Sequence, residues 1–119
     1  MKNDSSGSQN VIREIRNEGE AVVLKLGGEI DMRTSTGVKS KLKELFEDYP
    51  RVLVVDMTEV EFMDSSGLAT LVGALKWCRI HGSELRLAGL AQGVRSVFEI
   101  CRLETIFQIY DSLAEALSK

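Results

Sequence analysis

Residues 52–55, Val-Leu-Val-Val, restrict the fold more than any other segment because they are apolar at every position. A strand with one face in water alternates apolar and polar side chains, whereas a strand covered on both faces is apolar throughout. The run therefore predicts a central parallel strand. Parallel strands need long crossover connections, and helical patterns both precede and follow this run. The sequence thus predicts an α/β domain with right-handed crossovers.

Hydrophobic periodicity predicts the remaining elements of this domain. Residues 11–15 and 21–26 have β-type patterns around the turn-forming residues 17–19, which predicts an antiparallel N-terminal hairpin. The two glycines at 27 and 28 are expected to end the second strand of that hairpin. The other expected elements are helices that begin near residues 36, 66, 94 and 113, and short strands at 85–87 and 106–110.

Length and charge limit the class of protein. With 119 residues the chain fits one domain, which we expect over residues 11–119 after a polar, disordered tail or cloning remnant at 1–10. The net charge of −3 argues against a nucleic-acid-binding surface, so the expected partner is another protein. No segment approaches the roughly 20 apolar residues of a membrane span, and the N-terminus is too polar for a signal peptide. We therefore expect a cytoplasmic protein that does not bind membranes.

The sulfur-containing and aromatic side chains are interpreted as packing residues. Cys78 and Cys101 are widely spaced within helical patterns, so they fit neither a metal site nor a disulfide framework. Met57, Met63, Trp77 and the phenylalanines are scattered through periodic positions rather than gathered in one motif. The sequence therefore predicts no metal and no cofactor.

Asp64, Ser65, Ser66 and Gly67 occupy the junction where an apolar run gives way to a helical pattern. The first N–H groups of a helix lack intrahelical partners and lie at the positive end of its dipole, which favours an attached anion such as a phosphate. One of the two serines is expected to be the N-cap, because serine is among the preferred capping residues. A helix needs only one such cap, so the other hydroxyl, facing solvent, is the candidate functional group.

The sequence gives little support to a catalytic role. Its only histidine, His81, is 16 residues from Ser65 along one expected helix, which corresponds to roughly 24 Å and is too far for a catalytic pair. Asp56 ends an apolar strand as in receiver domains, but Met57 rather than a second acid follows it. The glycine-rich motifs that bind nucleotides are also missing. We therefore expect no enzymatic activity.

Residues 54–73, VVDMTEVEFMDSSGLATLVG, resemble the signature of the STAS domain, in particular that of the small, freestanding anti-sigma factor antagonists of bacteria. The stretch Gly28-Glu29-Ile30-Asp31 is similar to the G-E-x-D that follows the second strand in that family. The resemblance covers almost the whole chain. It implies a single domain with a four- to five-stranded mixed sheet and helices largely on one face. Ala69 departs from the pattern, because many members have glycine there.

The resemblance also implies a regulatory mechanism. In such proteins the unmodified form binds an anti-sigma factor that is also a serine kinase, and this binding releases the sigma factor. The kinase then phosphorylates the serine that follows the aspartate of D-S-S-G, which is Ser65 here. A separate phosphatase restores the unmodified form. The partner-binding residues expected from this reading are Glu29, Asp31, Asp64, Ser65, Ser66 and Gly67.

Two alternatives remain open. Glu29 and Asp31, taken alone, are typical of solvated acids in a loop between a strand and a helix. Domains of this type also serve as non-switching scaffold subunits in stress-sensing or lipid-transport complexes. In a scaffold of that kind, Ser65 would never be phosphorylated.

Overall fold

The computed structural model describes residues 11–119, and the expected disordered tail at 1–10 lies outside the described residues. Five strands form one sheet in the order β1-β2-β3-β4-β5. β1 is antiparallel to β2, and the other neighbours are parallel. The elements are β1 Ile12–Glu18, β2 Ala21–Ile30, α2 Ser35–Phe46, β3 Val52–Met63, α3 Ser65–His81, β4 Glu84–Ala88, α4 Gln92–Ile100, β5 Gln108–Tyr110 and α5 Leu113–Ser118. The mixed α/β fold predicted from the sequence is confirmed.

β3 is the central strand, and both of its faces are covered. Leu53 and Val55 belong to the larger apolar cluster, whereas Val54 between them belongs to a smaller cluster. All three are fully buried. Because successive side chains of a strand point to opposite faces, the two clusters lie on opposite sides of the sheet. The prediction from the unbroken apolar run is therefore confirmed.

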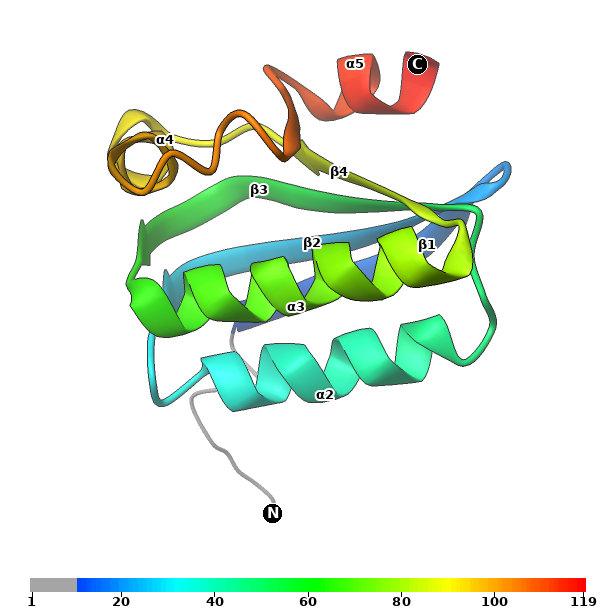
Figure 1. The fold of residues 1–119 in the computed structure, drawn as a ribbon, viewed down its shortest axis with the longest axis horizontal. Coiled ribbons are helices and arrows are strands. Elements are labelled where there is room, and N and C mark those ends of the chain that lie inside the picture. The colour runs from blue at the N-terminus through cyan, green and yellow to red at the C-terminus, as the bar shows by residue number, and fades with distance from the viewer. Residues whose placement is uncertain (1–10) are drawn as a thin grey trace.

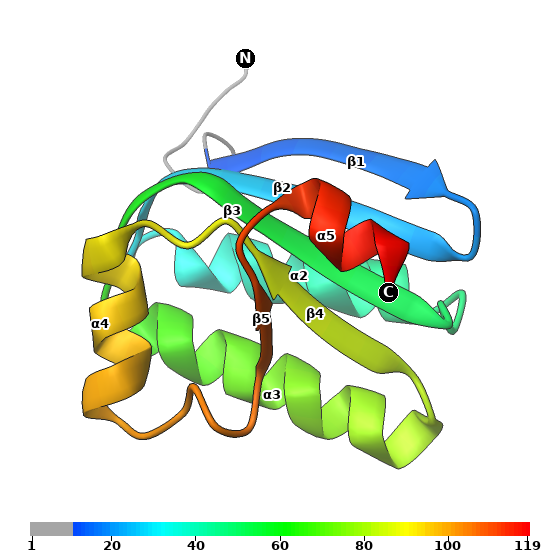
Figure 2. The same ribbon diagram turned by 90° about the horizontal axis from the view of Figure 1, so that it is seen from above.

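The helices divide unequally between the two faces of the sheet. α2 and α3 lie side by side beneath it, and α5 lies on the opposite face (Figure 1). Viewed from above, α5 covers the middle of the sheet, and α4 lies at one end (Figure 2). Val94 and Phe98 of α4 pack into the same larger cluster as α2 and α3. Among the helices that the structure describes, α5 alone contributes to the smaller cluster, through Ala116, so the helices are largely on one face as predicted.

The predicted hairpin is present, but its second strand is longer than expected. Gly27 and Gly28 do not end β2, which continues to Ile30. The pairing with β3 shifts register on either side of the glycine pair, and Gly28 has a φ of 78°. A Cβ atom at Gly27 would lie 2.6 Å from Nε of Arg13 on the neighbouring strand β1. The glycines therefore form a bulge that allows Arg13 to cross the strand, not a strand end.

The two cysteines have different environments. Cys78 is buried in the larger cluster, where desolvation raises the pKa of its thiol to about 11. Cys101 follows α4 and is exposed, so the packing role predicted for it is wrong.

Within residues 11–119, none of the helices combines the length and the apolar character that a bilayer crossing requires.

Candidate functional site

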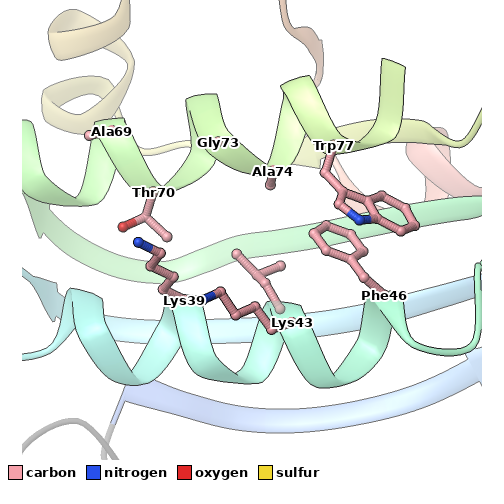
Figure 3. A pocket seen from close by; sticks show the side chains of 9 residues that line it. Lys39, Lys43, Phe46, Ala69, Thr70, Gly73, Ala74 and Trp77 are labelled. Carbon is pink, nitrogen blue, oxygen red and sulfur yellow. The ribbon is translucent and has the colours of Figure 1, made fainter. Parts of the chain in front are cut away.

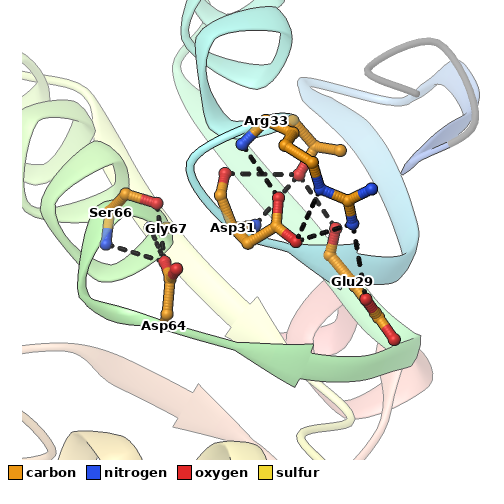
Figure 4. A network of polar contacts seen from close by, with 7 residues as sticks. Glu29, Asp31, Arg33, Asp64, Ser66 and Gly67 are labelled. Carbon is orange, nitrogen blue, oxygen red and sulfur yellow. Dashed lines mark hydrogen bonds and ion pairs between the residues drawn. The ribbon is translucent and has the colours of Figure 1, made fainter. Parts of the chain in front are cut away.

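The segment of interest lies where β3 ends and α3 begins. The N–H of Asp64 donates to the carbonyl of Ile30 at 3.1 Å, and Ile30 pairs with Met63 at the end of the sheet. These contacts bring the β3–α3 junction next to the turn between β2 and α2 (Figure 4). The two segments that the resemblance selected are therefore neighbours in space.

Asp64, not a serine, is the N-cap of α3. Its Oδ1 accepts hydrogen bonds from the N–H groups of Ser66 at 2.9 Å and Gly67 at 3.4 Å, and from the hydroxyl of Ser66 at 2.6 Å. The expectation that Ser65 or Ser66 caps the helix is wrong. Asp is as good a cap as Ser, and here its carboxylate binds two otherwise unpaired N–H groups at once. The hydroxyl of Ser66 and these N–H groups lower the pKa of Asp64.

The two serine hydroxyls consequently have different environments. Ser66 is half-buried, and its hydroxyl donates to Asp64. Ser65 is the first residue of α3 and is exposed. Among the described residues, no side chain or backbone group forms a hydrogen bond with the Ser65 hydroxyl. The prediction that one hydroxyl of this pair faces solvent is confirmed, and that hydroxyl belongs to Ser65.

Gly67 permits the close approach of α3 to β2. A Cβ atom at this position would lie 2.8 Å from Cγ2 and 3.1 Å from the carbonyl oxygen of Ile30, and 2.9 Å from Cγ of Met63. Contacts this short would force the first turn of α3 away from the sheet. Gly67 is buried, and it positions the first turn of α3, with Ser65 and Ser66, against β2.

The acidic residues predicted on the β2 side form a compact network with Arg33. Asp31 Oδ2 accepts from Arg33 Nη2 at 2.8 Å, and Asp31 Oδ1 accepts from the N–H of Arg33 at 2.9 Å. These bonds to Arg33 lower the pKa of Asp31. Glu29 pairs with the same guanidinium at 3.5 Å. Asp31 thus shapes the turn into α2, whereas Glu29 is an exposed residue of β2 and not the loop acid that was expected.

Two exposed apolar side chains flank this polar surface. Met32, in the turn after β2, is 80% exposed, and Phe62, near the end of β3, is 50% exposed. Phe62 pairs across the strands with Glu29. Sequence reasoning read the phenylalanines as packing residues, which is wrong for Phe62, and it did not single out Met32 or Arg33. Their exposure depends on the packing of distant segments, although a methionine between two charged residues was a weak signal.

Within residues 11–119, the groups that the sequence offered for catalysis lie apart. Ser65 and His81 are the first and last residues of α3, so they are separated by roughly 24 Å as predicted. Asp56 is buried, and its Oδ1 accepts from the N–H and the hydroxyl of Thr58. In the part of the chain that the structure describes, no three His, Cys, Asp or Glu residues gather to hold a metal ion. What the surface presents is a free hydroxyl, a charged network and two apolar side chains.

Comparison with known proteins agrees with this geometry. The sequence matches the STAS domain family over residues 13–116, which is most of the chain. The protein belongs to the STAS domain family. An anti-sigma-B factor antagonist from Listeria monocytogenes is 43% identical to this STAS domain over 84 residues, which cover 71% of this chain and 74% of the relative.

Solved structures share the same STAS fold. An anti-sigma factor antagonist from Mycobacterium paratuberculosis is 25% identical, with a TM-score of 0.82 over 88% of this chain and 89% of the other. The anti-sigma factor antagonist SpoIIAA in its unphosphorylated form is 22% identical, with a TM-score of 0.76 over 87% and 91% of the two chains. The phosphorylated form of SpoIIAA, from Bacillus, is 21% identical, with a TM-score of 0.70 over 88% and 96%.

Proposed function

We propose that this STAS domain protein is a phosphorylation-switched anti-sigma factor antagonist. In its unmodified form it binds an anti-sigma factor that is also a serine kinase, and this binding frees the sigma factor for transcription. Phosphorylation of Ser65 by the bound kinase ends the complex, and a phosphatase acting on phospho-Ser65 restores it. The proposal places the protein in the cytoplasm and assigns it no catalytic step of its own. The identity to an anti-sigma-B factor antagonist supports the choice of partner.

The observation that carries the proposal is the exposed, unbonded hydroxyl of Ser65 at the first position of α3. A kinase needs access to the side-chain oxygen of its target, and Ser65 offers it. The neighbouring hydroxyl of Ser66 donates to Asp64, so it is less available. SpoIIAA, which has the same fold, exists in both phosphorylated and unphosphorylated forms.

The residues around Ser65 suit a surface that binds a protein and then releases it. Met32 and Phe62 offer exposed apolar area, which is typical of the centre of a protein–protein interface. Glu29, Asp31 and Arg33 add charges that set the orientation of a partner. We therefore assign docking to the surface formed by these five residues and the β3–α3 junction.

A phosphate on Ser65 changes the charge of this surface more than its shape. It adds about −1.5 to −2 charges at neutral pH. If a partner carboxylate lies about 6 Å away, each added charge costs roughly 1.5 to 3 kcal/mol at an effective dielectric constant of 20 to 40. Two charges would then weaken binding by about a hundredfold or more. The positive end of α3 tolerates the added anion, so the domain stays folded while the complex dissociates.

The test measures binding to each candidate anti-sigma factor kinase of the same genome, with wild-type protein and with Ser65→Asp. We expect Ser65→Asp to bind about a hundredfold more weakly at an unchanged Tm, and ATP to convert wild-type protein into a species modified at Ser65. Ser40→Asp, a matched change at an exposed serine of α2, should bind like the wild type. Equal affinities for Ser65→Asp and wild-type protein would contradict the electrostatic switch.

Intact-mass measurement of the protein from its native cells separates the switch from the non-switching scaffold. A species heavier by one phosphate and mapped to Ser65 supports the switch. If that species is missing in every growth condition, the protein acts as a constitutive STAS scaffold and the proposal fails.

A further inference from the structure

A groove with a volume of about 280 Å³ lies between α2 and α3 and opens to solvent (Figure 3). It reaches the β3–α3 junction at Thr70, whose hydroxyl donates to the carbonyl of Ser66 at 3.0 Å. Side chains from both helices line it: Lys39, Leu42, Lys43 and Phe46 from α2, and Ala69, Thr70, Gly73, Ala74 and Trp77 from α3. The volume is just below the range of roughly 300 to 1,000 Å³ that is common for small-molecule sites.

One end of the groove is closed by aromatic rings. Phe46 and Trp77 stack face to face, with ring centroids 4.0 Å apart and an interplanar angle of 5°. His81 stacks on Trp77 at 4.1 Å, and Tyr49 packs against both of these rings. The groove therefore ends at an apolar wall and does not continue along the full length of α3.

Gly73 keeps the groove open, and the packing of the domain does not require a glycine there. A Cβ atom at Gly73 would meet nothing within 4 Å, in contrast to Gly67 on the same helix. A glycine inside a helix is destabilising relative to alanine, because it restricts the unfolded chain less. Gly73 therefore lowers the stability of α3 although no neighbouring atom that the structure describes requires a glycine there. This is consistent with a site that an external molecule fills.

The mouth of the groove is positively charged. Lys39 and Lys43 are exposed and reach from α2 toward α3 (Figure 3). Within residues 11–119 neither lysine forms an ion pair, whereas Lys41 between them pairs with Glu44 at 3.0 Å. None of the lining residues is acidic. In a chain of net charge −3, this local excess of positive charge is complementary to an anionic group.

We propose that the α2–α3 groove binds a free medium-chain fatty acid. The carboxylate would lie between the ammonium groups of Lys39 and Lys43, and the acyl chain would extend toward Trp77. The distance along α3 from Ala69 to Trp77 is roughly 12 Å, which is close to the length of an extended chain of about ten carbon atoms. The closed aromatic end favours the terminus of a chain over a partner helix, which would need an open groove. This site is independent of the role proposed for Ser65.

Titration of the full-length protein with sodium decanoate tests the proposal. Trp77 is the only tryptophan and lines the groove, so its fluorescence reports occupancy, and calorimetry gives the stoichiometry. We expect saturation at one decanoate per protein. Decyltrimethylammonium, which has the same chain and the opposite charge, should bind at least about tenfold more weakly, and so should butanoate, which has the same charge and a short chain.

Two variants assign the binding to the groove. Gly73→Leu fills it and should abolish decanoate binding while the Tm stays equal or rises, because leucine is a better helix former than glycine. Gly93→Leu is its control, since a Cβ atom at Gly93 in α4 also meets nothing within 4 Å. The charge-reversing double variant Lys39→Glu/Lys43→Glu should weaken binding at least about tenfold. Lys76→Glu/Lys119→Glu changes the charge equally outside the groove and should bind like the wild type.

Several results would overturn the proposal. They are equal affinity for decanoate and decyltrimethylammonium, unchanged binding by Gly73→Leu, the absence of any saturable response to decanoate, and a response to vesicles of anionic phosphatidylglycerol without a response to monomeric decanoate. The last result would show that Lys39 and Lys43 bind an anionic membrane surface and not a free fatty acid. An acidic amphipathic peptide that binds where decanoate does not would identify the groove as a docking site for a helix, which also contradicts the proposal.

Discussion

The two ends of α3 are built in different ways. At the N-terminal end, the carboxylate of Asp64 accepts hydrogen bonds from the N–H groups of the first turn, and in the described part of the chain the hydroxyl of Ser65 forms no hydrogen bond. At the C-terminal end, Gly82 adopts a φ of 74°, and its N–H and that of Ser83 both donate to the carbonyl of Cys78. Nδ1 of His81 lies 2.9 Å from the carbonyl of Trp77, within the aromatic stack.

The difference concerns how each end depends on its surroundings. The C-terminal end is fixed by backbone geometry and by aromatic rings that pack against α2. The N-terminal end is fixed by a few polar contacts and by the close approach of Gly67 to β2, and it is open to solvent. A change of charge at the N-terminal end can therefore alter the binding of a partner without disturbing the packing of the C-terminal end against α2.

Gly67→Ala should have the largest effect of the substitutions that test this comparison. The added Cβ atom would lie 2.8 Å from Ile30 and 2.9 Å from Met63, so we expect a loss of about 1 to 3 kcal/mol in the free energy of unfolding. Urea denaturation measures this loss. Gly73→Ala on the same helix has open space and should instead stabilise by up to about 1 kcal/mol. Equal stabilities of the two variants would mean that α3 does not press against β2 at Gly67.

Asp64→Ala should have the next largest effect. The substitution leaves the N–H groups of Ser66 and Gly67 without their acceptor, and we expect the Tm to fall by roughly 4 °C, as for the loss of a good N-cap. Asp64→Asn retains a side-chain oxygen and should restore most of that loss. If Asp64→Ala melts like the wild type, a serine hydroxyl can take over the cap, as the sequence alone suggested.

The cap shows where sequence reasoning stops. The sequence placed the strand-to-helix junction within one residue and predicted a free hydroxyl, because hydrophobic periodicity and the preferences of helix ends are local. It assigned the cap to Ser65 or Ser66, whereas Asp64 is the cap, because the choice among adjacent capping residues depends on side-chain rotamers. The extent of β2 was missed for a different reason. Gly27 and Gly28 remain in the strand only because β3, far along the chain, pairs with them.

Gly82→Ala tests the C-terminal end. Alanine in the left-handed conformation costs about 1 kcal/mol relative to glycine, and nothing else near Gly82 would be disturbed, because a Cβ atom there meets no atom within 4 Å. We expect this loss in thermal or urea unfolding, with binding at the Ser65 surface unchanged. If Gly82→Ala shows only this loss of stability but no longer binds the partner, the two ends of α3 are coupled.

The groove between α2 and α3 also could not be predicted from the sequence. Two adjacent small residues such as Gly73 and Ala74 can indicate the close approach of another backbone, but the space over Gly73 is open in the fold. A small residue in a helical pattern signals only that a side chain is missing. Whether a neighbouring segment or solvent occupies the space depends on the crossing of two helices that no local pattern specifies.

Ser66→Ala should have the smallest effect, and pH reveals it. The hydroxyl and the N–H of Ser66 lower the pKa of Asp64, so this carboxylate stabilises the fold above its unfolded pKa and loses that contribution as pH falls through the lower folded value. Removal of the hydroxyl should raise the pKa of Asp64 toward its ordinary value. The stability difference from wild-type protein should therefore be complete at neutral pH and disappear at acid pH. NMR titration of the Asp64 carboxyl measures the shift. Ser65→Ala, which removes a hydroxyl that makes no bond to Asp64, should leave the titration unchanged, and equal shifts in both variants would contradict the assigned hydrogen bond.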